Sequence, residues 1–385
     1  FIIHHSSFII HHSSFIIHHS AFIIRIQEST MSHSHTPTLP YSLLTLAALT
    51  LLAACAAPTP SGPRTLTVMT HDSFALSESV LKEFETANNA TVQVLKSGDA
   101  GTMLNTALLN KQSPLADVLY GVDNALLSRA LDGNLFERYD SPALAALPEE
   151  LKLDPDNRAL PVDYGDVCLN YDKAYFAGHN LLPPANLSDL AKPEYKGLLV
   201  VEDPATSSPG LAFMLTTAVA FGGEGFTDYW SALRHNDVKV APDWETAYYT
   251  DFSGSSGAGP RPIVVSYASS PPAEVFFAAT PLSDAPTASV TSEGACFRQI
   301  EFVGILSGAK NRDLAEKWVD FMLGQAFQED LPLNMFVYPA LPSAALPDVF
   351  AQYAPVVESP VILSPQAIAA KRDELIKVWT ETVVR

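Results

Sequence analysis

The chain has few basic residues, and few histidines beyond its first part. Its 385 residues include 23 Lys and Arg against 42 Asp and Glu, which gives a formal net charge of −19 at pH 7. This acidic excess would repel nucleic acid and attract a cationic ligand, although the solubility of an exported protein explains it equally well. Only His71, His179 and His235 lie beyond residue 54. We therefore expect no nucleic-acid partner, no metal and no cofactor.

Short catalytic motifs are also absent from the sequence. There is no G-x-S-x-G nucleophile elbow, no H-E-x-x-H zinc motif, no P-loop and no G-x-G-x-x-G fingerprint. The Gly/Ser run at 254–257 follows no strand pattern, and pairs of carboxylates carry no information in so acidic a chain. We expect a protein without enzymatic activity. A hydrolase is the alternative, which a turnover assay would reveal.

One apolar stretch has the pattern of a targeting segment. Residues 31–54 begin at a methionine, carry no charge and end in Leu-Ala-Ala before Cys55, which is similar to the processing box of bacterial lipoproteins. We predict a signal peptide at 31–54, acylation of Cys55 and a tether over 55–65, so that acyl chains hold the protein at the periplasmic or cell surface. Residues 1–30 repeat the heptapeptide FIIHHSS, and we interpret them as upstream, non-native sequence, a genuine extension being the alternative.

Two cysteines remain once Cys55 is assigned to lipidation. Cys168 and Cys296 would both lie outside the reducing cytosol, where disulfides persist. A single sequence gives no distance between them, so a disulfide and two separate buried thiols are both compatible with it.

Strand and helix patterns alternate along the chain. Residues 66–70, 90–96 and 116–123 have strand patterns, and segments with helical spacing separate them, which indicates a parallel sheet of the α/β class. Ligands of such sheets bind at the carboxyl ends of the strands. The polar residues at those ends are His71, Asp72, Ser73, Gly101, Thr102 and Asp123.

Two longer strand patterns, at 160–173 and 262–271, suggest crossings between two lobes. Trp318 falls on the apolar face of a later helical pattern and is assigned to the core. The predicted parts are lobe 1 (66–161 and 268–341), lobe 2 (162–267) and a C-terminal helical segment that packs on both (342–385).

Several motifs occur together in one order: THDSF at 70–74, PVDYGDVCLNYDK at 161–173, DPATSSPGL at 203–211, DWETAYY at 243–249, VVSYASSP at 264–271 and MFVYP at 335–339. Together they resemble the thiamine-binding subunit of bacterial ABC importers, a branch of the type II periplasmic binding proteins. The resemblance implies a monomeric two-lobed clamp with mixed sheets, helices on their faces and two crossover strands as the hinge. Such a clamp closes on thiamine or its phosphates and presents the ligand to a permease.

The resemblance also implies an aromatic box around the ligand. Thiamine has a permanent positive charge, which aromatic faces and a carboxylate can hold. This chain has His71 where the family pattern has Tyr, and Phe336 where it has Trp. The predicted ligand-binding residues are His71, Asp72, Ser73, Gly101, Thr102, Asp123, Asp163, Tyr164, Ser207, Trp244, Tyr248, Tyr267, Phe336 and Tyr338. Core packing is the alternative role of the rings, and helix capping is the alternative role of Asp72 and Ser207.

A ferric-ion binding protein of the same fold is the nearest rival. The adjacent residues Tyr248 and Tyr249 could supply phenolate oxygens to Fe(III), with Asp72 and Asp163 as further oxygen ligands. Trp244, four residues before the first tyrosine, favours a stacking wall instead.

Overall fold

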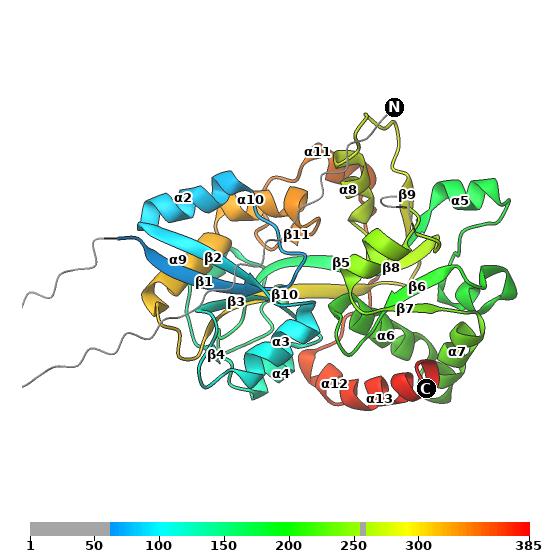
Figure 1. Cartoon of the computed structure of the whole chain (residues 1–385), viewed down its shortest axis with the longest axis horizontal. Helices are drawn as coiled ribbons and strands as arrows, with labels where there is room; N and C mark the ends of the chain where they lie inside the picture. The colour runs from blue at the N-terminus through cyan, green and yellow to red at the C-terminus, as the bar shows by residue number, and fades with distance from the viewer. Residues whose placement is uncertain (1–61, 255–258) are drawn as a thin grey trace, which may run out of the picture. The chain divides into compact units, whose positions relative to one another are not determined.

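The computed structural model describes residues 62–254 and 259–385, which form a mixed α/β structure around one sheet (Figure 1). The main strand order is β2-β1-β3-β10-β5-β8-β6-β7. The short strand β4 pairs with β10, and β9 and β11 pair with β5. The strands are β1 (Arg64–Thr70), β2 (Ala90–Lys96), β3 (Val118–Asp123), β4 (Phe136–Glu137), β5 (Leu160–Asp172), β6 (Leu199–Glu202), β7 (Lys239–Ala241), β8 (Ile263–Tyr267), β9 (Thr287–Val290), β10 (Phe297–Leu306) and β11 (Tyr338–Pro339). The predicted α/β class is confirmed.

The first three strands have the parallel pairing that their alternation with helices predicts. β1 pairs in parallel with both β2 and β3. All six residues of β3 are buried, as expected of an interior strand with both faces covered. Their carboxyl ends therefore meet at one edge of the sheet.

The second half of the chain adds antiparallel strands. β10 runs antiparallel to both β3 and β5. The segment 262–271, where we expected the return crossing, contains β8, which has five residues and lies between β5 and β6. β10 pairs with β5 along residues 160–167 of β5. Nine of the ten residues of β10 are buried. β5 and β10 are thus the two long strands in the middle of the sheet.

Helices cover the sheet, as Figure 1 shows. α6 contacts β5, β6, β8 and β10, and its apolar sequence is buried over most of its length. The helices are α2 (Glu78–Asn88), α3 (Ala100–Leu109), α4 (Leu127–Asp132), α5 (Lys173–Gly178), α6 (Ser208–Phe221), α7 (Gly223–His235), α8 (Ser270–Phe276), α9 (Arg312–Met322), α10 (Gln325–Asn334), α11 (Asp348–Tyr353), α12 (Pro365–Ala369) and α13 (Arg372–Val383).

The predicted C-terminal helical segment contains α11, α12 and α13. α12 contacts α4, near the first strands, whereas α13 contacts α6 and α7. The segment therefore touches helices from both halves of the sheet.

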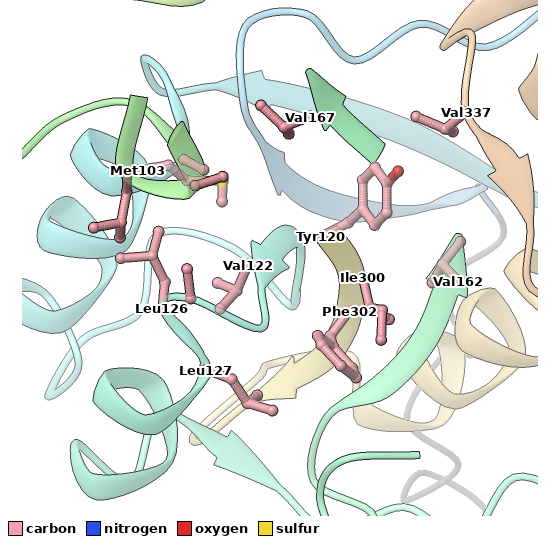
Figure 2. Packing of buried hydrophobic residues seen from close by; sticks show 14 of the residues in the cluster. Met103, Tyr120, Val122, Leu126, Leu127, Val162, Val167, Ile300, Phe302 and Val337 are labelled. Atoms are coloured by element: carbon pink, nitrogen blue, oxygen red, sulfur yellow. The ribbon is translucent and has the colours of Figure 1, made fainter. Parts of the chain in front are cut away.

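The main hydrophobic core runs along the sheet. Buried side chains of β3, β5 and β10, among them Val122, Val162 and Phe302, pack together in it (Figure 2). Trp318 is fully buried, so its assignment to the core is confirmed.

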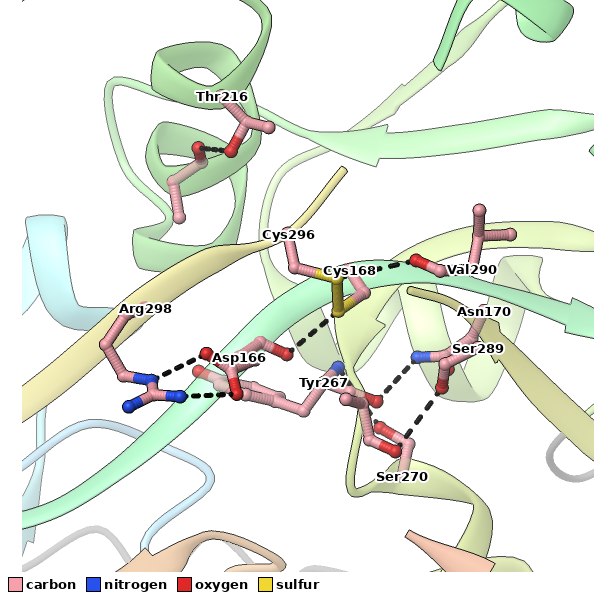
Figure 3. The surroundings of a disulfide bond; sticks show 12 residues. Asp166, Cys168, Asn170, Thr216, Tyr267, Ser270, Ser289, Val290, Cys296 and Arg298 are labelled. Atoms are coloured by element: carbon pink, nitrogen blue, oxygen red, sulfur yellow. Dashed lines mark hydrogen bonds and ion pairs between the residues drawn. A yellow bond between two sulfur atoms is a disulfide. The ribbon is translucent and has the colours of Figure 1, made fainter. Parts of the chain in front are cut away.

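Cys168 in β5 and Cys296 just before β10 form a disulfide in the structure (Figure 3). Of the two alternatives that the sequence leaves open, the structure has the bonded pair. The bond joins residues 128 positions apart in the sequence, at the end of the β5–β10 pairing.

Residues 1–61 lie outside the described part of the chain, and with them the predicted signal peptide and Cys55. Within 62–254 and 259–385, no helix is both apolar enough and long enough to cross a bilayer.

Candidate functional site

A cavity of about 280 Å³ opens at the carboxyl ends of several strands. This edge is where open α/β sheets bind their ligands, and the volume is close to the lower end of small-molecule sites, about 300 Å³. Residues that follow β1, β2, β6, β7 and β8 all contribute to it, together with one residue of β10. The lining is formed by His71, Ser73, Ala75, Asp99, Ala100, Ser208, Pro209, Trp244, Glu245, Tyr248, Tyr249, Tyr267, Ser270, Ala273, Phe277, Glu301, Asn334, Met335, Phe336 and Val337.

One wall of the cavity is aromatic. The rings of Trp244 and Tyr248 are stacked, with centroids 5.0 Å apart and planes 17° from parallel. Tyr249 and Tyr267 meet the Trp244 ring edge to face, at 5.5 and 6.5 Å. The structure thus brings together three of the predicted rings and adds Tyr249, which is 52% exposed. This wall offers π faces to a flat or cationic ligand.

Hydrogen bonds hold Trp244 in place. Its backbone N–H donates to Asp99 Oδ2 at 3.2 Å, and its indole Nε1–H donates to Ser266 Oγ at 3.0 Å. Tyr248 follows in a π-helical turn over Thr246–Asp251 and donates its hydroxyl to Glu274 Oε1 at 2.6 Å. These bonds fix the orientation of the stacked pair.

Tyr267 is the last residue of β8, and residues of the neighbouring strands fix the position of its side chain. Its hydroxyl accepts a hydrogen bond from Gln299 Nε2 at 2.9 Å. A Cβ atom at Gly165 would lie 2.8 Å from Tyr267 Cδ1, so only glycine leaves room for this ring. Tyr267 and the nearby Ser270 and Asn170 appear in Figure 3, close to the disulfide.

Phe336 lines the cavity with a backbone in the left-handed region. Its φ is +54°, which a bulky residue rarely adopts, and such conformations concentrate at functional sites. Its carbonyl accepts a hydrogen bond from Ser269 Oγ at 2.5 Å. The centroid of its ring lies 5.5 Å from that of Phe277 and 6.1 Å from that of Phe350. The segment after α10 is thereby tied to the start of α8.

The buried carboxyl group of Glu301, in β10, lines the same cavity as the aromatic wall. Glu301 lines the cavity, and the Tyr120 hydroxyl lies 2.5 Å from Asp163 Oδ2 and 3.2 Å from Glu301 Oε2. Burial raises the pKa of Asp163 to about 7, and burial together with the charge of Asp163 raises the pKa of Glu301 well above its usual range. The pair therefore holds a proton at neutral pH.

His71 stands next to this acidic pair. Its Nε2 lies 3.5 Å from Glu301 Oε1, and burial, followed by the charge of Lys96, lowers its pKa to about 4. A Cβ atom at Gly121, whose φ is +102°, would lie 2.3 Å from His71 Cδ2, so glycine makes room for the imidazole. His71 is thus a neutral ring in the cavity wall.

The raised carboxyl pKa values predict how stability depends on pH. Asp123 and Asp163 both have a pKa of about 7 in the folded protein, mainly through burial. At pH values below the ordinary carboxyl pKa, protonation of these two groups makes its full contribution to the stability of the fold. This contribution is lost as the pH rises from there toward 7. We expect each group to lower the free energy of unfolding by up to about 1.4 kcal/mol per pH unit between pH 5 and 7.

Urea unfolding at pH 5, 6, 7 and 8 checks this dependence. Asp163→Asn should flatten the slope between pH 5 and 7, because the amide keeps the shape but does not titrate. Asp284→Asn, which removes a surface carboxylate, is the control and should leave the slope unchanged. Equal slopes in the wild type and Asp163→Asn would contradict the prediction.

Asp72 lies beside the main cavity rather than in its wall. Its Oδ1 accepts a hydrogen bond from the Gly98 N–H at 2.9 Å, which ties the end of β1 to the end of β2. It lines an adjoining pocket of about 130 Å³, with Asp99, Asp243 and Glu245 among the other residues. The predicted residue Ser73 lines both spaces.

Four further predicted residues do not line the cavity, and three of them make hydrogen bonds at or just before the start of α6. The Gly101 N–H donates to the Thr206 carbonyl at 3.0 Å, and Thr102 is exposed. Ser207 caps α6 by accepting from the Gly210 N–H, and Asp123 accepts a hydrogen bond from Ser208 Oγ. The cavity is lined by their neighbours Ala100, Ser208 and Pro209. Ser207 therefore has the helix-capping role that we gave as the alternative to ligand binding.

Asp163, Tyr164 and Tyr338 also lie outside the lining. Asp163 is fully buried behind Glu301. Tyr164 and Tyr338 stack on each other with centroids 5.4 Å apart, and the Arg298 guanidinium lies 4.9 Å from the Tyr164 ring centroid. These three side chains therefore contact other residues of the protein rather than the cavity.

Sequence reasoning missed several lining residues. Glu301 is the one acid in β10 and lies within the otherwise apolar run at 300–306, and Asp99 directly precedes α3 as its N-cap. A lone acid in a strand predicted to be buried is a signal that could have been used. Asn334 and Met335 carry no such signal, since they end an ordinary helix.

The comparisons with known proteins concern the family and the fold of the chain. A family model for bacterial extracellular solute-binding proteins matches residues 113–356. The thiamine-binding periplasmic protein of Salmonella typhimurium is 32% identical over 342 residues, which are 88% of this chain and 98% of that protein. The thiamine-binding periplasmic protein of Escherichia coli is 30% identical over the same shares.

Solved structures show the same fold. One described as a periplasmic thiamin binding protein superposes with a TM-score of 0.74 at 26% identity, covering 84% of this chain and 99% of that chain. A ferric ion-binding protein A from Pasteurella haemolytica superposes with a TM-score of 0.67 at 18% identity, covering 83% and 98%. The chain belongs to the bacterial extracellular solute-binding proteins, has the type II periplasmic binding protein fold, and is similar over most of its length to thiamine-binding periplasmic proteins.

Proposed function

We propose that this protein binds thiamine in the cavity at the strand ends and delivers it to an ABC permease. The observation that carries the proposal is that the stacked pair Trp244–Tyr248 and the buried carboxyl group of Glu301 line the same cavity. Relatives that are named for thiamine binding support it over nearly the whole chain. The family is one of binding proteins, which agrees with the expectation of a protein without enzymatic activity.

The chemistry of the cavity suits this ligand. The thiazolium ring of thiamine carries a positive charge that no proton loss can remove, and the aminopyrimidine ring is flat. A desolvated cation over a Trp or Tyr face gains about 2 kcal/mol, and ring stacking adds about 1 kcal/mol. Glu301 can release its proton when a cation binds beside it, so that the wall gains a negative charge where it is needed.

Closure of two lobes on the ligand is part of the proposal. The proposed lobes are residues 66–161 with 268–341, and residues 162–267, so that the chain would pass between them within β5 and at the end of β8. Ligand contacts with both lobes favour the closed state only to the extent that they are stronger there. A monomer, anchored to the membrane by an acylated Cys55 in the periplasm or at the cell surface, would then present the loaded clamp to the permease.

Calorimetric titration with thiamine tests the proposal. We expect one binding site per chain with micromolar or tighter affinity, as for an aromatic site that excludes water. The absence of heat and of any ligand-induced rise in melting temperature would overturn it. Incubation with thiamine phosphates should release no inorganic phosphate, since the expected protein has no hydrolase activity.

Ferric citrate in the same titration tests the iron alternative. Tyr248 donates its hydroxyl to Glu274, and Trp244 stacks on its ring, which places the phenol in an aromatic wall. Within residues 62–254 and 259–385, no group of three or more His, Cys, Asp and Glu side chains is arranged to hold a metal ion. A visible charge-transfer band on adding ferric iron would favour the alternative.

A further inference from the structure

Three oxygen-bearing side chains meet behind the cavity wall. Tyr120, Asp163 and Glu301 come from β3, β5 and β10, which are neighbours in the sheet, and Glu301 pairs in register with Asp163. Tyr120 and Asp163 have no exposed surface, and Glu301 is 5% exposed. Of the three, Glu301 alone lines the cavity. A ligand in the cavity can therefore act on this cluster only through the Glu301 carboxyl group.

The contacts within this cluster need one more proton than the tyrosine supplies. The Tyr120 hydroxyl has a single hydrogen, yet its oxygen lies 2.5 Å from Asp163 Oδ2 and 3.2 Å from Glu301 Oε2. The shorter contact is a charge-assisted hydrogen bond from the hydroxyl to the Asp163 carboxylate. The longer contact becomes a full hydrogen bond only when a second proton lies between Tyr120 and Glu301. The geometry thus has a place for one proton on Glu301.

The groups around Glu301 favour that proton. His71 Nε2 lies 3.5 Å from Glu301 Oε1, but burial and then the charge of Lys96 lower the His71 pKa to about 4, so the imidazole is neutral at pH 6 and above. The Lys96 ammonium group itself donates to the Asp72 carbonyl. The titratable groups that act on Glu301 from the elements around it are His71 after β1, Tyr120 and Asp123 on β3, Asp163 on β5 and Tyr267 on β8. None of these groups is positive at neutral pH, and neighbouring carboxylates disfavour a second negative charge.

We propose that Asp163 and Tyr120 are positioning residues that keep a proton on Glu301 in the empty cavity, and that the cationic ligand expels this proton when it binds. This inference rests on the proposed function and adds the regulation of binding by pH. A fixed positive charge beside Glu301 favours the carboxylate form. The O–H bond of Glu301 then breaks, its electron pair stays on the carboxylate, and the proton passes to the buffer. The wall becomes more negative only while the ligand is bound.

Calorimetric titration of the wild type with thiamine at pH 6, 7 and 8 tests this linkage. The free protein binds a proton that the complex lacks, so the dissociation constant should fall as the pH rises, by up to about tenfold per pH unit for one proton. Repeating the titration at pH 7 in phosphate and in Tris counts the protons, because the two buffers take up a proton with different heats. We expect about one proton to be released per ligand bound.

Three variants assign the proton to this cluster. Glu301→Gln should bind thiamine more weakly, with the same dissociation constant at pH 6 and pH 8. Asp163→Asn removes a charge that helps to keep Glu301 protonated, so at pH 6 it should bind thiamine more tightly than the wild type. A merely structural role of Asp163 predicts weaker binding at every pH. Tyr120→Phe removes the hydroxyl that stabilises both carboxylates, so its binding profile should move to higher pH.

Glu83→Gln is the matched control, since Glu83 is an exposed residue of α2, and it should keep the wild-type dependence on pH. Equal wild-type dissociation constants at pH 6 and pH 8, with heats that do not depend on the buffer, would overturn the linkage. This measurement needs no variant, so it decides even where a variant does not fold. A slope that persists in Glu301→Gln would overturn the assignment to Glu301, and weaker binding of Asp163→Asn at pH 6 would overturn the role of Asp163. If thiamine binds the wild type at none of these pH values, the proposed function is what fails.

Discussion

Replacing Trp244 with alanine is expected to weaken thiamine binding by about 2–4 kcal/mol, which is roughly 30- to 1,000-fold in the dissociation constant. The indole stacks on Tyr248 and meets Tyr249 and Tyr267 edge to face, so its removal opens the whole aromatic wall. Calorimetric titration of the variant with thiamine measures the loss directly.

Two controls separate a lost contact from a damaged fold. Trp244→Phe keeps a π face but loses the hydrogen bond to Ser266, so we expect a smaller loss than for alanine. Trp244 is only partly buried, so the melting temperature of the alanine variant without ligand should fall by only a few degrees. Thiamine affinity equal to that of the wild type would remove Trp244 from the site.

Loss of the disulfide is the other large expected effect, this time on stability. Cys168→Ser combined with Cys296→Ser should lower the free energy of unfolding by about 4 kcal/mol, because the bond closes a long loop in the unfolded chain. The two cysteines are 128 positions apart in sequence. Urea unfolding of the variant and the wild type, each with and without a reducing agent, provides the measurement.

The reduced wild type serves as the internal control. Its unfolding curve should coincide with that of the double serine variant, whereas the variant should not respond to the reducing agent. Identical curves for the oxidised and reduced wild type would mean that the bond contributes nothing. Because Cys168 pairs in register with Ser266, the acceptor of the Trp244 indole N–H, we also expect weaker thiamine binding in the reduced protein.

Local sequence patterns were sufficient for most of the elements. The strands β1, β2 and β3 and the helices between them follow from side-chain periodicity, which depends only on neighbouring residues. The return between the lobes was assigned to 262–271, where the structure has β8, and both β8 and the longer strand β10 pair antiparallel with β5. Periodicity identifies such strands but not their partners, because pairing depends on residues that lie far away in the chain.

The aromatic residues of the cavity wall were predicted from the resemblance to the thiamine-binding family, and their positions along the chain agreed with it. Trp244, Tyr248 and Tyr267 lie near strand ends, and strand ends can be identified from sequence. Glu301 was missed because its importance depends on register: it is paired with Asp163 across β10 and β5, although the two are far apart in the chain. Asp72 and Asp163 were assigned to the ligand from their positions at strand ends, but their side chains point to neighbouring groups.

The amino-acid sequence by itself determined the α/β class, the likeness to thiamine-binding proteins and the presence of aromatic residues at strand ends. These properties depend on the order of residue types along the chain. Tertiary structure alone decided that the two cysteines are bonded, that Glu301 rather than Asp163 lines the cavity, and that Asp99 accepts the Trp244 N–H. Each of these depends on which distant segments pair and in what register, and burial then sets the charge of the groups that meet there.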